Sequence, residues 1–87
     1  MMITLKQISA KTGIPQSTAA RYTVLFMEYF PRKKDGRKLL FLEVEALETA
    51  QRIQRLYKDG KTTDQVHGIL EKERTAVMDA LPFHILQ

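Results

Sequence analysis

The sequence predicts a mostly helical domain of about four helices with one small β-hairpin. Apolar residues recur at helical spacing on both sides of a central Asp35-Gly36 pair, which signals a tight turn between strands. Thr4 and Thr62 each precede a glutamine by three residues, the spacing of a capping box at the start of a helix. A chain of 87 residues is long enough for one domain with a small core.

We expect the first helix to begin at Thr4 and to end before Gly13, because glycine tolerates the left-handed backbone that often follows a helix. Leu5 and Ile8 then face the core. The second helix is expected over residues 15–28, after a link of only about three residues. Such a short link fixes the two helices at a steep angle, as in a helix-turn-helix.

The second helix has one apolar and one polar side. It opens with Pro15, whose missing N–H is not needed in a first helical turn. Its expected apolar side contains Ala19, Ala20, Tyr22, Val24 and Phe26. Its expected outer side and leading turn contain Gln16, Ser17, Thr18 and Arg21.

A short hairpin is expected between the two helix pairs. Residues 29–33 and 38–42 can pair as strands around Asp35-Gly36, with a type I′ turn at the tip. Pro31 cannot donate to a strand ladder, so we expect it at an edge or just outside the pairing.

The third and fourth helices follow the hairpin. The third is expected over residues 43–59 and stops at Gly60. Its apolar stripe consists of Val44, Leu47, Ala50, Ile53, Leu56 and Tyr57. The fourth opens at Thr62 and stops at Pro82. Its apolar stripe consists of Val66, Ile69, Leu70, Val77 and Leu81.

Charge is divided unevenly along the chain. Residues 1–41 carry eight basic and two acidic side chains, a net charge of +6, whereas residues 42–87 carry six basic and eight acidic ones, a net charge of −2. A basic half beside a mildly acidic half predicts one face that binds a polyanion. The alternative is a solvated surface whose charges are uneven by chance.

The polar side of the second helix and the hairpin have the chemistry of duplex DNA recognition. Arg21 can make a bidentate contact with guanine, and Gln16 can pair with adenine. The hydroxyls of Ser17 and Thr18 suit phosphate oxygens. The cations of the hairpin can bind phosphates or enter the minor groove. They are Arg32, Lys33, Lys34, Arg37 and Lys38. The alternatives are a solvated polar helix and a charged run that protects a strand edge.

The order and spacing of these elements resemble the DNA-binding domain of the MerR type, a winged helix-turn-helix. Residues 3–22 are similar to its opening helix pair, with Arg21-Tyr22 at the usual Arg-Tyr position. Residues 31–36 resemble its wing, and residues 46–70 resemble its next helix pair. The resemblance implies that the second helix enters the major groove and that the wing contacts the backbone. It adds Tyr22 to the helix contacts and assigns a wing position to Arg37.

The resemblance implies a sequence-specific double-stranded DNA-binding protein, a small transcriptional regulator. The chain is expected to stand alone, with no room for a sensor domain. Small members include excisionase-like architectural proteins and chromosome- or plasmid-anchoring proteins, so an architectural or segregation role is an alternative. A protein-interaction module that binds an acidic partner is the alternative from another class.

Residues 77–87 form an apolar C-terminal extension after a DNA-binding domain of residues 1–76. If exposed, its side chains form a surface for a homodimer or for another protein partner. The alternative is a tail that folds over the core. The candidate dimer contacts are Val77, Met78, Leu81, Phe83, Ile85 and Leu86.

Several other classes of protein are not expected. There is no cysteine, which excludes disulfide scaffolds, cysteine-type zinc fingers and thiol redox chemistry. His67 and His84 lack the spacing of metal ligands, and there is no phosphate loop, nucleophile motif or cofactor fingerprint. We therefore expect no metal, no cofactor and no enzymatic activity. There is neither a membrane-span length of apolar residues nor a signal-peptide pattern, so a cytoplasmic, nucleoid-associated protein is expected.

Overall fold

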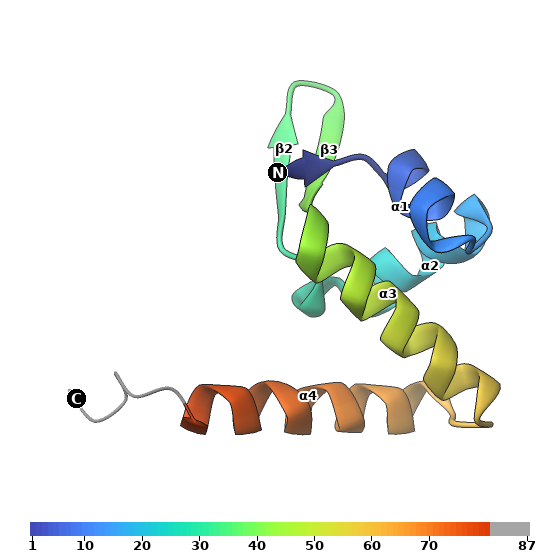
Figure 1. Cartoon of the computed structure of the whole chain (residues 1–87), viewed down its shortest axis with the longest axis vertical. Helices are drawn as coiled ribbons and strands as arrows, with labels where there is room; N and C mark the ends of the chain where they lie inside the picture. Colours follow the sequence, from blue (N-terminus) through green and yellow to red (C-terminus); the bar gives the residue numbers. More distant parts are fainter. Residues whose placement is uncertain (81–87) are drawn as a thin grey trace.

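The structure is a computed structural model that describes the backbone of residues 1–80 and the side chains of residues 1–74. Within that part, the chain forms four α-helices, one 3-10 turn and three short strands. In chain order they are β1 (Met2–Ile3), α1 (Leu5–Thr12), α2 (Gln16–Leu25), η1 (Met27–Tyr29), β2 (Arg32–Asp35), β3 (Lys38–Leu42), α3 (Glu43–Lys58) and α4 (Thr63–Ala80). The predicted class, mostly helical with four helices and a small hairpin, is confirmed (Figure 1).

The first helix begins and ends where the sequence predicts. The Gln7 amide donates to the Thr4 hydroxyl at 3.2 Å, and the Gln7 side chain accepts from the Thr4 amide at 2.8 Å, which completes the capping box. Gly13 ends α1 with a left-handed φ of 77°. The Thr12 hydroxyl then donates to the Ile8 carbonyl at 2.7 Å and accepts from the Ile14 amide at 3.2 Å. These bonds hold the short link to α2 in one conformation.

The second helix is shorter than predicted. It starts after Pro15 and ends at Leu25, and the chain continues as the tighter turn η1 instead of remaining α-helical through residue 28. The change occurs at Phe26, whose φ of −120° leaves the helical region. The turn carries the buried Phe30 to a position 6.3 Å from the ring of Phe41 in the sheet. Burial of this aromatic pair accounts for the early end of α2.

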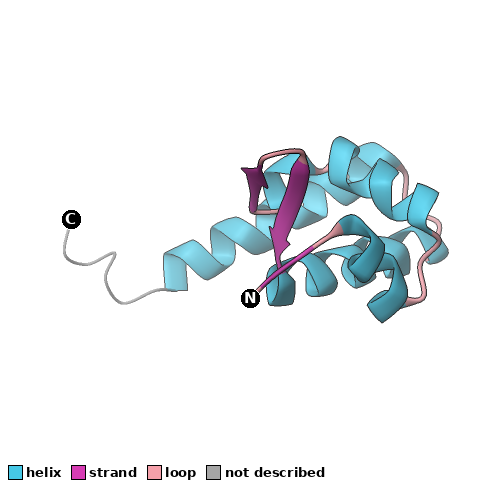
Figure 2. Ribbon diagram, turned by 90° about the horizontal axis from the view of Figure 1, so that it is seen from above, coloured by secondary structure: helices cyan, strands magenta, loops and turns pink. Residues whose placement is uncertain are grey.

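The hairpin forms as β2 and β3, and β1 adds a third strand that the sequence analysis missed. The antiparallel order is β1-β3-β2, with Met2 opposite Leu42. Figure 2 shows the strands gathered on one face of the helical body. Pro31 lies just outside β2, as predicted, but the predicted strand over residues 29–33 was wrong at its start, because residues 27–29 form η1.

The turn at the hairpin tip also differs from the prediction. Asp35 pairs with Lys38, so the loop consists of Gly36 and Arg37. Gly36 has a φ of 62°, whereas no residue other than glycine has a positive φ in the described chain. A type I′ turn needs positive φ at both loop residues, so the prediction was wrong, and positive φ at the first alone is the type II′ pattern.

Between α3 and α4, one helix ends and the next begins where the sequence predicts. Gly60 follows α3 with a φ of 85°, and its amide donates to the Tyr57 carbonyl at 3.0 Å while the Lys61 amide donates to Leu56 at 3.1 Å, a Schellman motif. The Thr62 amide donates to the Gln65 side chain at 2.9 Å, which caps α4. Residue 77, the predicted start of the C-terminal extension, falls within α4.

The core joins all the helices to the sheet. Its largest fully buried side chains are Phe26, Phe30, Phe41, Ile3, Ile8, Ile14, Ile53 and Val66. The predicted stripes of α3 and α4 are confirmed at Ala50, Ile53, Leu56, Val66 and Leu70, which are buried, and at Leu47, Tyr57 and Ile69, which pack against the core. Two predicted core residues were wrong, because Val24 is 70% and Val44 is 62% exposed. Both lie two residues from core positions, about 200° around a helix, on its outer side.

The side chains of Val77 and Met78 and the residues Leu81, Pro82, Phe83, Ile85 and Leu86 lie outside the part that the structure describes. In the described part, no helix combines the length and apolar character needed to cross a membrane.

Removal of the first capping box should destabilise the fold modestly. Thr4→Ala deletes the hydroxyl that accepts from the Gln7 amide, so we expect a loss of about 1 kcal/mol in the free energy of unfolding. Thr4→Ser keeps the acceptor and should lose only a few tenths of that amount. Urea denaturation followed by circular dichroism measures both, and equal losses in the two variants would contradict a capping role.

Candidate nucleic-acid interface

The outer side of α2 presents most of its predicted contact residues to solvent. Gln16, Ser17 and Arg21 are exposed, and Thr18 is half-buried. No side chain caps the start of α2, because Pro15 occupies the N-cap position. The first amide groups of α2 therefore have no side-chain acceptor and can bind an anion, as helix N-termini commonly do.

Tyr22 differs from the other predicted contacts because it is only 7% exposed. Its ring stacks on Tyr57 of α3, with centroids 5.8 Å apart and planes 23° apart. The predicted inward packing of this ring is therefore confirmed. No hydrogen bond of the Tyr22 hydroxyl is found within the described residues.

A hollow of about 280 Å³ lies beside Tyr22, and we call it the α2 hollow. It is lined by Thr18, Arg21, Tyr22, Tyr57 and Thr63. The Tyr57 and Thr63 hydroxyl oxygens are 2.8 Å apart and share a hydrogen bond. The hollow thus combines hydroxyl groups from three helices with one guanidinium group, a donor set suited to an anion such as a phosphate.

The electrostatics of the hollow keep Tyr22 protonated. Burial raises the pKa of the Tyr22 hydroxyl above its usual 10.0, and Tyr57 raises it further, whereas the nearby Arg21 opposes the shift. A protonated hydroxyl can donate a hydrogen bond to a phosphate oxygen at neutral pH. Arg21 adds a positive charge at the same place.

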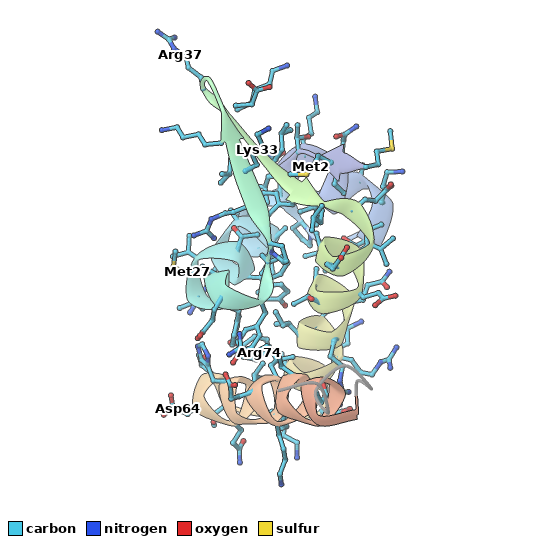
Figure 3. The ribbon with its side chains drawn as sticks, turned by 90° about the vertical axis from the view of Figure 1, so that its left-hand side faces the viewer. Met2, Met27, Lys33, Arg37, Asp64 and Arg74 are labelled. Carbon is cyan, nitrogen blue, oxygen red and sulfur yellow. The ribbon has the colours of Figure 1, made fainter. Side chains whose placement is uncertain are left out.

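The hairpin carries the second set of predicted contacts, all of them exposed. They are Arg32, Lys33, Lys34, Arg37 and Lys38. None of these five takes part in a salt bridge with another described residue, and only Asp35 in the same two strands carries a negative charge. In Figure 3, Arg37 projects from the tip of the hairpin, at the end of the molecule opposite α4. The hairpin is therefore a protruding, uncompensated positive surface.

Sequence reasoning missed two residues of the α2 hollow, Tyr57 and Thr63. Tyr57 counted only as part of the apolar stripe of α3, and Thr63 follows the capping residue Thr62. The only signal in the sequence was the position of both residues beside the turn that joins α3 to α4. Their proximity to Tyr22 depends on how the two helix pairs pack.

His67 is half-buried and lies against Phe26, with ring centroids 4.4 Å apart. In the described part of the chain, no group of three or more histidine, cysteine, aspartate or glutamate side chains is placed to hold a metal ion.

No protein-family model, curated protein or solved structure matches the chain significantly.

Proposed function

We propose that this chain binds double-stranded DNA in a sequence-specific manner, with α2 in the major groove and the hairpin as a wing on the backbone or in the minor groove. The observation that carries the proposal is the set of five hairpin cations, which are exposed and have no salt bridge within the described residues. Uncompensated cations on a protruding hairpin suit a polyanion, because each phosphate they neutralise releases a counterion.

The α2 hollow supports a specific contact within this proposal. One backbone phosphate binds at the hollow, where Tyr22 and Thr18 donate hydroxyl hydrogen bonds and Arg21 supplies the charge. This position favours phosphate binding over base reading for Arg21. Gln16 and Ser17, which are exposed at the start of α2, then remain to meet base edges.

In the cell, such a protein acts as a small cytoplasmic, nucleoid-associated transcriptional regulator, in keeping with the resemblance to the MerR type. An architectural role uses the same contacts, and the two roles differ in the DNA sequences they require. Binding of an acidic partner protein through the hairpin is the competing function, because it needs positive charge but neither α2 nor the hollow.

A fluorescence anisotropy titration at about 50 mM salt tests the proposal, since several phosphate contacts give measurable affinity under these conditions. A random duplex and a duplex selected from a random pool are compared. We expect binding to both, with tighter binding to the selected duplex. Absence of binding to any duplex would refute the proposal and favour the acidic protein partner.

Arg21→Ala and Gln16→Ala should separate phosphate binding from base reading. Arg21→Ala should weaken binding to both duplexes alike, roughly tenfold near 0.1 M salt, and reduce the salt slope by about 0.9. Gln16→Ala should cost about 1–3 kcal/mol of discrimination and leave the random duplex nearly unaffected. Loss of discrimination in Arg21→Ala would instead support the guanine contact expected from the sequence.

Tyr22→Phe tests the buried hydroxyl alone, because phenylalanine retains the ring that stacks on Tyr57. A hydrogen bond to a charged group contributes about 1.5–3 kcal/mol, so DNA affinity should fall by roughly ten- to hundredfold. Stability should not fall, since the hydroxyl has no hydrogen bond to a described residue.

The matched control is Tyr29→Phe. Its hydroxyl donates to Glu71 at 2.9 Å, at a different place in the fold. This variant should lose stability and retain DNA affinity. Equal DNA affinities for wild type and Tyr22→Phe would show that the α2 hollow is not part of the DNA interface.

A further inference from the structure

A larger hollow of about 580 Å³ lies between η1, α3 and α4, and we call it the acidic groove. Its carboxylates come from Glu28, Glu45, Glu48 and Glu73, and its apolar lining includes Tyr29, Pro31 and Leu70. In Figure 1, η1, which borders this groove, lies on the other side of α3 from α1. The volume is within the range of sites that enclose ligands, about 300–1,000 Å³.

Arg52 and Arg74 also line the groove, but each is already paired with another glutamate. They therefore do not neutralise the other three groove carboxylates. Arg52 forms a salt bridge with Glu73 at 2.6 Å. Arg74 lies 3.0 Å from a carboxylate oxygen of Glu71 on its own helix and 5.2 Å from the centroid of the Tyr29 ring. Glu28, Glu45 and Glu48 are exposed, and none has a salt bridge to another described residue. The groove therefore keeps three uncompensated negative charges.

An occupant of this groove needs positive charges on apolar stems. Lysine and arginine meet both requirements, because their methylene chains lie along apolar surface while their charged ends stay at the rim. In the described chain, such side chains are concentrated on β2, β3 and the turn between them. This hairpin has five cations and one carboxylate, a net charge of +4. The charges of the hairpin and the groove are complementary.

A hairpin cannot fill the groove of its own chain. Pro31 belongs to the groove and lies at the base of the hairpin, where its carbonyl accepts from the Leu42 amide at 3.1 Å. Folding the hairpin back over the groove would break the β1-β3-β2 sheet. In Figure 3, Arg37 at the tip of the hairpin lies at the opposite end of the molecule from Arg74, which borders the groove. The occupant must therefore come from another molecule.

We propose that the acidic groove receives the basic hairpin of a second copy of this chain. The contact joins two different surfaces, so each added copy offers a free hairpin at one end and a free groove at the other. It needs no nucleic acid and does not depend on the proposed DNA binding. The competition with DNA alone rests on the proposed function: DNA would use the same hairpin cations and would displace the hairpins from the grooves.

Sedimentation equilibrium of the full chain without DNA tests this contact. At about 10 mM salt, where charges act over about 30 Å, we expect a weight-average mass above that of one chain. At about 1 M salt, where the range is about 3 Å, the mass should return to that of the monomer. Monomers at both salt concentrations would overturn the proposal.

Charge reversal identifies the two surfaces. A groove variant, Glu45→Lys with Glu48→Lys, and a hairpin variant, Lys33→Glu with Lys34→Glu, should each be monomeric alone. Mixing the two should restore association, because the unchanged hairpin of the groove variant, with its net charge of +4, then meets the unchanged groove of the hairpin variant. Arg55→Glu with Lys72→Glu is the matched control; these exposed cations lie outside both surfaces, and this variant should associate like wild type.

The mixture distinguishes loss of the hairpin–groove contact from misfolding of a variant and from association through another surface. Circular dichroism confirms that each variant is folded before it is mixed. Association of either variant alone, or failure of the folded variants to associate on mixing, would overturn the proposal. Association through the C-terminal apolar segment would persist in each variant alone, and that result would also overturn the proposal.

Discussion

Lys33→Ala with Lys34→Ala is expected to weaken binding to every DNA duplex alike, by roughly ten- to a hundredfold near 0.1 M salt. The two side chains lie on opposite faces of β2, since neighbours in a strand alternate, so at least one faces a phosphate backbone in either docking orientation of the hairpin. If both contact phosphates, each lost contact costs roughly tenfold, and the slope of log affinity against log salt falls by about 2. Anisotropy titrations at several salt concentrations measure both quantities.

Arg55→Ala with Lys72→Ala provides the control for this double variant. It removes the same amount of charge from exposed positions on α3 and α4, away from α2 and the hairpin. Its affinity should change by less than about threefold, because only long-range attraction is altered. Equal losses in the two double variants would show that net charge, rather than the hairpin, governs binding.

Phe26→Ala is expected to cause the largest loss of stability of any substitution considered for this chain, about 3–5 kcal/mol. Phe26 is fully buried at the end of α2, with its ring centroid 6.3 Å from that of Tyr57 and 4.4 Å from that of His67. It therefore joins α2 to both later helices. Native domains of this kind have total stabilities of about 5–15 kcal/mol, so the variant should be partly or wholly unfolded.

Thermal unfolding followed by circular dichroism measures this effect, with a Tm change of about 4–8 °C per kcal/mol for a domain of this size. Met27→Ala is the control, because Met27 adjoins Phe26 but is 51% exposed, and its Tm should change little. If Phe26→Ala does not fold, Phe26→Leu gives a measurable intermediate loss. A Tm for Phe26→Leu equal to that of Met27→Ala would contradict the joining role.

Helix boundaries marked by local hydrogen bonding were predictable from the sequence. Thr4 and Thr62 cap helices because each hydroxyl accepts from the backbone amide three residues later, and the glutamine side chain there accepts from the threonine amide. Gly13 and Gly60 end helices because a left-handed backbone is easiest for glycine. These features depend on neighbours within a few residues, so the sequence contains all the information they require.

Features that depend on distant partners were predicted poorly. The end of α2 at Leu25 is set by the packing of Phe30 on Phe41, which belongs to β3. Strand β1 has only two residues, too few for an alternating pattern, and exists because β3 lies beside it. Val44 follows other apolar residues at plausible spacing, but its side of the first turn of α3 has no neighbour to cover it.

The candidate interface also has one part that was predictable from the sequence and one part that depends on distant partners. The hairpin cations were identified by composition alone, since consecutive charges on a short hairpin have few internal partners. The α2 hollow could not be predicted, because it needs Tyr57 of α3 and Thr63 of α4 to meet Tyr22 of α2. The family resemblance added Tyr22 to the expected helix contacts, and the structure adds the side chains that surround it.

The place of β1 in the sheet affects the order in which the chain can fold. Met2 pairs with Leu42, and the Met1 carbonyl accepts from the Glu43 amide at 2.9 Å, whereas the helix pairs depend mainly on contacts between neighbouring segments. During synthesis the chain leaves the ribosome from its N-terminus, so β1 must wait for β3 to emerge while α1 and α2 can already pack. Closure of this long loop carries an entropic cost that the local contacts do not share. We therefore expect the sheet to be completed late, after nascent α1 and α2 have become compact.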